Sequence, residues 1–167
     1  KGIQAVPEIE AGLKTFKKQI PPTDQITFFY LIAYLFFNQK DYRKSLRWLG
    51  RILHHYDKQV HQHIHATARL FHLILHYELG NYDILQSLIR SSQRYLKTID
   101  TYFELENAFI RAFRRIINAV DRKEEIEIWK ELKETLIPIR ENKAQNQPFR
   151  YFNFMSWLEE KIIVGLH

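Results

Sequence analysis

The sequence of 167 residues is long enough for one domain, which would bury about 70% of the surface that its unfolded chain exposes. Apolar residues make up 46% of it and charged residues 26%, a balance that excludes an intrinsically disordered chain. The lack of cysteine excludes disulfides, thiolate metal sites and cysteine nucleophiles, while the net charge of +6 leaves both an acidic protein partner and nucleic acid open.

The excess of positive charge lies in the middle of the sequence. Residues 40–120 carry 13 basic and 7 acidic groups, whereas residues 1–39 carry 4 and 3, and residues 121–167 carry 8 and 9. The longest apolar stretch, Phe28 to Phe37, is about half as long as a membrane-spanning helix, and no signal-peptide pattern precedes it. We therefore expect a cytoplasmic protein that does not enter a membrane. Because the chain begins at Lys1 and its one methionine is Met155, we also expect it to be part of a longer protein.

Glycine and proline are rare, and between them apolar residues recur three and four positions apart, the pattern of amphipathic helices. This pattern predicts an all-α fold without strands. In chain order, the predicted helices cover residues 8–19, 24–38, 41–56, 60–79, 82–97, 102–119, 123–137 and 149–163. Segment 138–150 is polar and contains two prolines, so we expect a linker that lets the last helix fold back as a cap.

Short polar turns divide the six middle helices into three pairs at a fixed interval. Asp41, Asn81 and Asp121 stand 40 residues apart, and each is of a type that caps helix N-termini. A helix pair on its own would leave its apolar face uncovered, so we expect the pairs to stack side by side in an α-solenoid. The predicted single domain, residues 1–167, then contains repeats at about 24–57, 60–97 and 102–138 and a capping helix at 149–163.

The segment from Ala33 to Leu46 resembles the middle of a tetratricopeptide repeat. The small residues Ala33 and Ser45 and the turn Asp41-Tyr42 carry this resemblance, and Gly80-Asn81-Tyr82 repeats the turn. The pattern is also similar to that of helical domains in bacterial repeat proteins. In tetratricopeptide-like proteins the first helix of each pair lines a concave groove that binds a partner. The resemblance assigns to this groove residues Tyr30, Tyr34, Asn38, Ile74, Tyr77, Arg114 and Asn118.

This resemblance predicts a non-enzymatic scaffold that binds a peptide, a partner domain or another domain of the same chain. We expect no cofactor and no metal, because the sequence has no Gly-rich phosphate loop, GxSxG motif or EF-hand loop. An alternative is a helical-repeat protein that binds nucleic acid through the basic residues of 40–120. The basic residues on single helix faces, which could follow phosphates, are Arg43, Arg47 and Arg51, then Arg90, Arg94 and Lys97, then Arg111, Arg114 and Arg115.

Two clusters of unusual composition need a separate interpretation. Seven of the eight histidines lie between His54 and His76, and pairs four positions apart, such as His72 and His76, can chelate a metal. Four histidines spread along one straight helix, His61, His65, His72 and His76, cannot converge on one ion. We therefore expect structural or surface histidines, with pH-sensitive binding or a metal as alternatives. The aromatic residues of the last helix are expected to pack on the third repeat, with a partner site as the alternative: Phe149, Tyr151, Phe152, Phe154 and Trp157.

Overall fold

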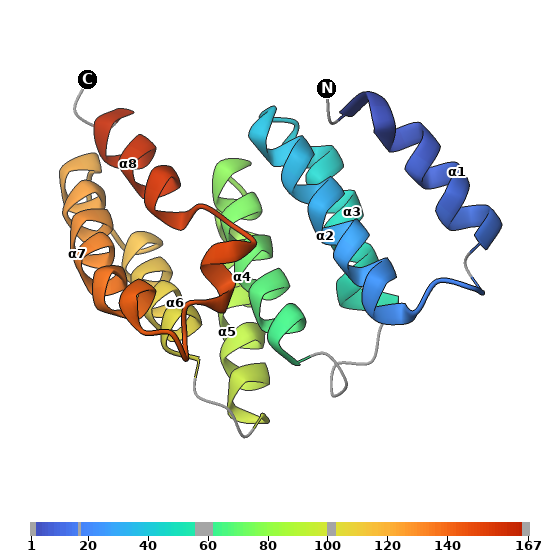
Figure 1. The fold of residues 1–167 in the computed structure, drawn as a ribbon. Helices are drawn as coiled ribbons and strands as arrows, with labels where there is room; N and C mark the ends of the chain where they lie inside the picture. Colours follow the sequence, from blue (N-terminus) through green and yellow to red (C-terminus); the bar gives the residue numbers. More distant parts are fainter. Residues whose placement is uncertain (1–2, 17, 56–61, 100–102, 165–167) are drawn as a thin grey trace. The chain divides into compact units, whose positions relative to one another are not determined.

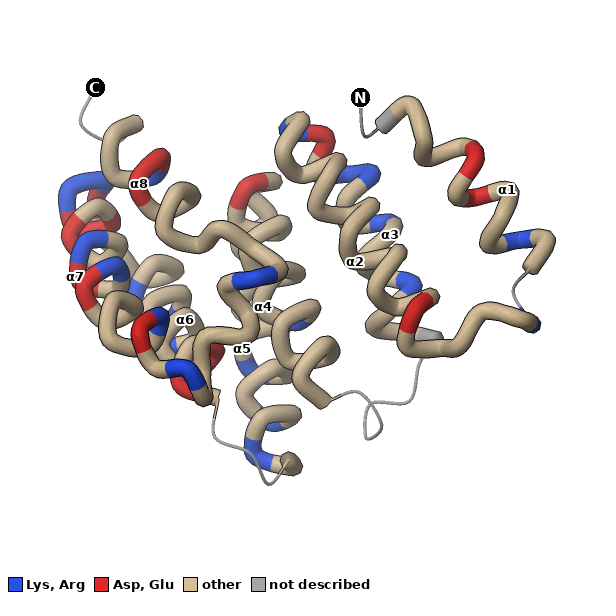
Figure 2. The backbone as a smooth tube through the Cα atoms, viewed as in Figure 1, with Lys and Arg blue, Asp and Glu red and all other residues tan. Residues whose placement is uncertain are grey.

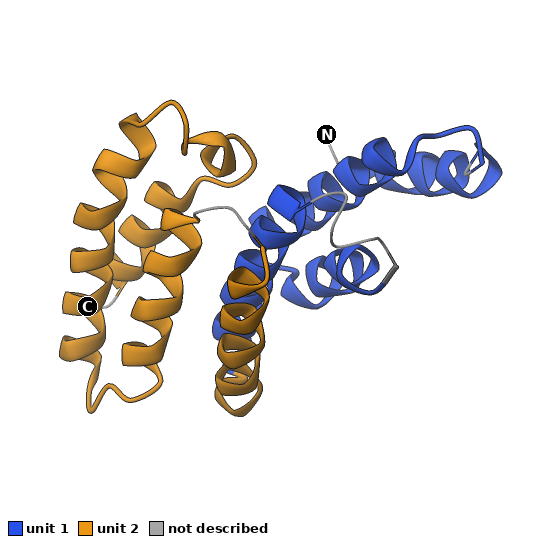
Figure 3. Cartoon of the chain, turned by 90° about the horizontal axis from the view of Figure 1, so that it is seen from below, with its two compact units in different colours: residues 1–80 blue, residues 81–167 orange. Residues whose placement is uncertain are grey.

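The fold was analysed in a computed structural model, which describes residues 3–16, 18–55, 62–99 and 103–164 (Figure 1). Within these ranges the chain is helical and contains no strand, so the predicted all-α class is confirmed. The contacts divide the chain into two compact units, residues 1–80 and residues 81–167, which Figure 3 colours separately. The boundary falls inside the second predicted repeat, and each unit is described here by itself.

The helices follow the predicted order. Unit 1 contains the short 3-10 helix η1 (Ile3–Ala5) and helices α1 (Val6–Phe16), α2 (Pro22–Asn38), α3 (Tyr42–His55) and α4 (Gln62–Glu78). Unit 2 contains α5 (Tyr82–Lys97), α6 (Glu104–Ile116), α7 (Arg122–Glu141), the 3-10 helix η2 (Gln147–Arg150) and α8 (Phe154–Val164). In each unit, helices that follow one another from α2 onward also pack against one another. No helix in the described ranges has the length and apolar character needed to cross a membrane.

The core of unit 1 forms where α2 meets α3 and α4. Phe71 of α4 is fully buried, and its ring lies 5.6 Å from that of Tyr30 and 5.3 Å from that of Phe37, both on α2. Where α2 and α3 meet, the buried Ser45 hydroxyl donates a hydrogen bond of 2.7 Å to the carbonyl oxygen of Ala33. The small Ser45 side chain therefore both fits this contact and satisfies its own buried hydroxyl group.

Two of the three turn residues act as the predicted N-caps. The Asp41 carboxylate accepts a hydrogen bond from the backbone N–H of Lys44, and that of Asp121 accepts one from Glu124. Asn81 occupies the same place before α5, but its side chain makes no capping hydrogen bond. Here Gly80 precedes the helix with a φ of 69°, a left-handed conformation that a glycine adopts without strain.

Four helix boundaries differ from the prediction by three residues or more, and one of them is the end of α6, at Ile116 instead of residue 119. Helix α7 continues through Pro138 to Glu141, so the expectation that the helix ends at residue 137 and a linker begins at 138 was wrong. The proline is exposed, and on either side of it Leu136 and Ile139 are buried, so core packing maintains the helix past a residue that cannot donate a backbone hydrogen bond. At the chain ends, α1 stops at Phe16 instead of residue 19, and α8 begins at Phe154 instead of residue 149.

The core of unit 2 is a cluster of aromatic rings from α6, α7 and α8. Trp129 of α7 is fully buried, and its ring lies 5.5 Å from Phe113 of α6 and 5.2 Å from Trp157 of α8. Phe152, Phe154 and Trp157 are all buried, so the expectation that these aromatic residues pack inside is confirmed for them. Phe149 and Tyr151, outside α8, are half-buried. On its exposed face α7 carries alternating basic and acidic residues, as Figure 2 shows.

Candidate interaction site

The seven residues assigned to the concave groove do not share one environment. Tyr30, Ile74 and Tyr77 are 3%, 0% and 8% exposed, so in this structure their side chains lie in the protein interior. They have almost no surface left with which to contact a partner. The apolar stripe of a helix indicates which residues avoid water, but it does not distinguish a groove floor from a face that another helix covers.

The other four predicted residues reach the surface, two in each unit. In unit 1, Tyr34 is half-buried, with its ring stacked on that of Phe37 at 6.4 Å, and Asn38 is exposed at the end of α2. In unit 2, Arg114 and Asn118 are both exposed, and the Asn118 side-chain amide donates a hydrogen bond of 2.7 Å to the Arg114 carbonyl oxygen. For these four residues a role in binding remains a prediction.

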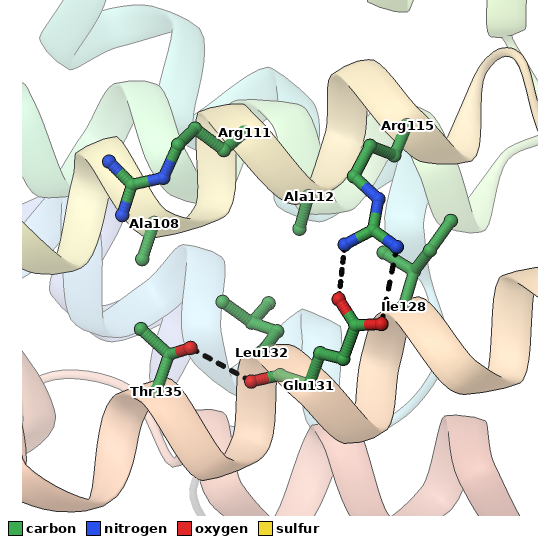
Figure 4. A pocket seen from close by; sticks show the side chains of 8 residues that line it. All are labelled: Ala108, Arg111, Ala112, Arg115, Ile128, Glu131, Leu132 and Thr135. Atoms are coloured by element: carbon green, nitrogen blue, oxygen red, sulfur yellow. Dashed lines mark hydrogen bonds and ion pairs between the residues drawn. The ribbon is translucent and has the colours of Figure 1, made fainter.

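A shallow groove lies between the consecutive helices α6 and α7 of unit 2 (Figure 4). It encloses about 180 Å³. Its floor is apolar and its rim is polar. The floor residues are largely buried, being 4%, 6%, 1% and 4% exposed in the order Ala108, Ala112, Ile128 and Leu132. The rim residues are exposed and are Arg111, Arg115, Glu131 and Thr135.

The spacing of residues on the two helices explains this groove. Ala108 and Ala112 are one helical turn apart, so their small side chains lie on the same face of α6 and leave open space beside α7. Arg111 and Arg115 are also one turn apart and form the α6 side of the rim. On α7, Glu131 and Thr135 form the opposite side, and the Thr135 hydroxyl donates a hydrogen bond of 2.8 Å to the Glu131 carbonyl oxygen.

One end of the groove holds an ion pair between Arg115 and Glu131. Both nitrogens of the guanidinium fork donate to the carboxylate, Nη1 to Oε2 and Nη2 to Oε1, the latter at 3.3 Å. The hydrogen bond from Arg115 lowers the pKa of Glu131, and the same bond raises the pKa of Arg115. Both side chains are exposed, so water and competing ions reach the pair, and it contributes little to folding stability.

The second rim arginine has no such partner. Arg111 is exposed, and its guanidinium makes no hydrogen bond and no ion pair with any residue in the described part of the chain. Figure 4 shows it on the α6 side of the groove, above the alanine floor. The groove therefore combines apolar surface, one arginine already bound to a carboxylate and one arginine free to bind another.

The histidine cluster gives no comparable site. The Nε2 atoms of His72 and His76 lie 3.1 Å apart, and burial lowers the pKa of both residues, that of His72 to about 3. Both are therefore neutral at physiological pH, which permits a hydrogen bond between the two rings. His65 is fully buried, while His61 lies outside the described residues. Among the residues that the structure describes, no three or more side chains are arranged to hold a metal ion.

One buried acidic residue was not identified from the sequence. Glu106, in the first turn of α6, is only 3% exposed, and its Oε1 atom has no hydrogen-bond partner among the described residues. Burial raises the pKa of this carboxyl to about 7, while a hydrogen bond from its own backbone N–H acts in the opposite direction. The sequence carried a signal, because Glu106 lies on the same helix stripe as Phe109, Ile110 and Phe113.

Comparison of the chain with protein-family models, curated proteins and solved structures gave no significant match. The proposals below therefore depend only on the residues of this chain and their arrangement.

Proposed function

We propose that this chain is a non-enzymatic, tetratricopeptide-like helical-repeat module that binds a peptide or a partner domain, and that the α6–α7 groove is one of its contact surfaces. The observation that carries the proposal is the position of Arg111, a free arginine at the rim of an apolar groove. Helical-repeat proteins bind partners through surfaces formed by stacked helix pairs. We keep the expected cytoplasmic location as part of this proposal.

The groove has the two kinds of surface that peptide recognition needs. Its alanine, isoleucine and leucine floor is only 1–6% exposed, so an apolar side chain of the partner makes a small contact with it. Its rim arginine forms directed hydrogen bonds, which fix the orientation of the partner, and arginine is among the residues most often found at the energetic centre of interfaces. The groove is shallow, so it suits one or two side chains of a longer ligand.

Binding of nucleic acid is the second candidate. It is favoured by exposed basic residues of α3 and α5, two helices on which Figure 2 shows several basic positions. These residues are Arg43, Lys44 and Arg47, and Arg90, Arg94 and Lys97. Of these, Lys44 is already paired with Asp41 at 2.8 Å. Helix α7 carries nearly balanced charge, so a basic surface does not continue along that helix. We therefore place protein binding first.

Filling the groove should weaken peptide binding without unfolding the chain. Thr135 is exposed on the α7 rim, so in Thr135→Trp the indole can cover the floor without being forced into the core. A peptide is first selected from a random 12-residue phage-displayed library against the unmodified chain. We expect Thr135→Trp to weaken the binding of that peptide about tenfold or more, measured by fluorescence polarisation, because the floor is no longer open.

The matched control is Glu134→Trp, which adds the same indole to a neighbouring exposed position of α7 outside the groove. This variant should bind the selected peptide within about twofold of the unmodified chain. Enrichment of no peptide at all would contradict the proposed function. Equal binding by the chain and by Thr135→Trp would show that the α6–α7 groove is not a contact surface, and Arg114→Ala and Asn118→Ala would then test the exposed residues at the end of α6 and just after it.

A further inference from the structure

The rim of the groove already binds one carboxylate, that of its own Glu131. This carboxylate is held by the fork of Arg115 through two hydrogen bonds. Arg111 stands one turn away on the same helix, about 6 Å along the helix axis. It carries the same guanidinium group at the rim, where Figure 4 shows it lying along α6 beside Ala108, and no described residue places an anion on it. The pair Arg115–Glu131 therefore illustrates the kind of contact that Arg111 is placed to make with a partner.

The charges of the rim are not balanced. Two arginines and one glutamate line it, so one positive charge remains without a counter-charge in the groove. An incoming carboxylate restores neutrality and accepts two hydrogen bonds from a planar guanidinium, an arrangement that lysine cannot provide. A ligand with several closely spaced negative charges is disfavoured, since Glu131 stands at the same rim and would repel it.

The floor of the groove indicates which kind of residue should lie next to the carboxylate in the partner. Four aliphatic side chains form it, and no aromatic residue lines the groove, so nucleotide bases would find no ring on which to stack. An apolar side chain of a peptide instead makes a small contact there, since the floor side chains are 1–6% exposed. These features favour a protein segment in which an acidic residue lies close to an apolar one over a nucleic acid.

We infer that the α6–α7 groove recognises an acidic residue flanked by an apolar residue in a peptide partner, with Arg111 as the residue that binds the partner's carboxylate. This inference rests on the proposed function and gives the chemistry of its ligand. The Glu131 carboxylate competes with the carboxylate of the partner, because it binds Arg115 and lowers the positive charge of the groove. Removing the charge of Glu131 strengthens binding of an acidic peptide, and removing that of Arg111 weakens it.

The test uses the peptide selected above in two forms, the acidic original and an analogue with each Asp or Glu replaced by its amide. Binding is measured to the unmodified chain, Arg111→Gln, Glu131→Gln and the control Arg140→Gln, an exposed arginine of α7 outside the groove. We expect Arg111→Gln to weaken the acidic peptide about tenfold and Glu131→Gln to tighten it severalfold. Arg140→Gln should change binding by less than about twofold.

The effects on binding of Arg111→Gln in the protein and of the acid-to-amide exchange in the peptide should also be coupled. In Arg111→Gln, exchanging the acidic peptide for its amide analogue should cause no further loss of affinity. The guanidinium that bound the carboxylate, and so distinguished the two peptides, is no longer present. Since Arg111 is exposed and contacts no described partner, the variant should keep the thermal midpoint of the unmodified chain.

The outcomes separate the two proposals. Selected peptides without an acidic residue, or equal losses in Arg111→Gln and Arg140→Gln, would overturn the acidic specificity, while loss of binding in Thr135→Trp would still support the proposed function. A selection that yields no peptide would overturn both. Tight binding of a single-stranded oligonucleotide that is weakened by Arg111→Gln and falls steeply with salt would favour nucleic acid and overturn the inference.

Discussion

Replacing Trp129 with alanine should lower the free energy of unfolding by about 3–5 kcal/mol. The indole is fully buried between Phe113 of α6 and Trp157 of α8, with ring centroids 5.5 Å and 5.2 Å away. Its removal deletes a large apolar contact surface and leaves a cavity where three helices of unit 2 meet. Urea unfolding followed by circular dichroism measures the change.

The control for this substitution is Val164→Ala at the end of α8, where the side chain is 62% exposed. It should change the free energy of unfolding by less than about 0.5 kcal/mol. A loss below about 1 kcal/mol for Trp129→Ala would mean that the aromatic cluster does not hold α6, α7 and α8 together.

Replacing Glu106 with glutamine should stabilise the chain at pH 8 by on the order of 3 kcal/mol and have little effect at pH 4. Burial raises the pKa of the Glu106 carboxyl from its ordinary value of 4.5 to about 7 in the folded chain. The folded state therefore holds this proton more tightly than the unfolded state. Its contribution is fully present below pH 4.5 and is lost as the pH rises through 7. Urea unfolding at pH 4, 6 and 8 gives the profile.

A neighbouring acid provides the comparison for Glu106. Glu104→Gln changes a half-buried carboxyl in the same turn of α6, and we expect its effect on stability to be small at each pH. We compare the free energy of unfolding of each variant with that of the unmodified chain at the same pH. This difference cancels the contributions of other titrating groups, including His72 and His76. Equal stabilisation by Glu106→Gln at pH 4 and pH 8 would contradict a buried, protonated Glu106.

The order and extent of the helices could largely be predicted from the sequence, because apolar periodicity and turn residues act locally. Helix α5 covers residues 82–97 as expected, and α2 ends at the predicted Asn38. Pro138 shows where local reasoning fails, since the buried residues beside it keep α7 intact where the proline alone predicts an end.

The candidate site was less predictable, because it depends on contacts between helices. The sequence singled out Arg111 and Arg115 as basic residues on one helix, but the pairing of Arg115 with Glu131 arises only when α6 and α7 lie side by side. In the same way, the aromatic and apolar character of Tyr30, Ile74 and Tyr77 suits a groove floor and a buried core equally well. Periodicity cannot decide between the two without knowing which faces the neighbouring helices cover.

The most direct measurement of the central claim is a map of backbone amide chemical shifts during titration with the selected acidic peptide. We expect the largest changes on the two walls of the α6–α7 groove, around Ala108, Arg111 and Ala112 on α6 and around Thr135 on α7. Changes centred on Tyr34 and Asn38, or on α8, with those four positions unaffected, would contradict the account.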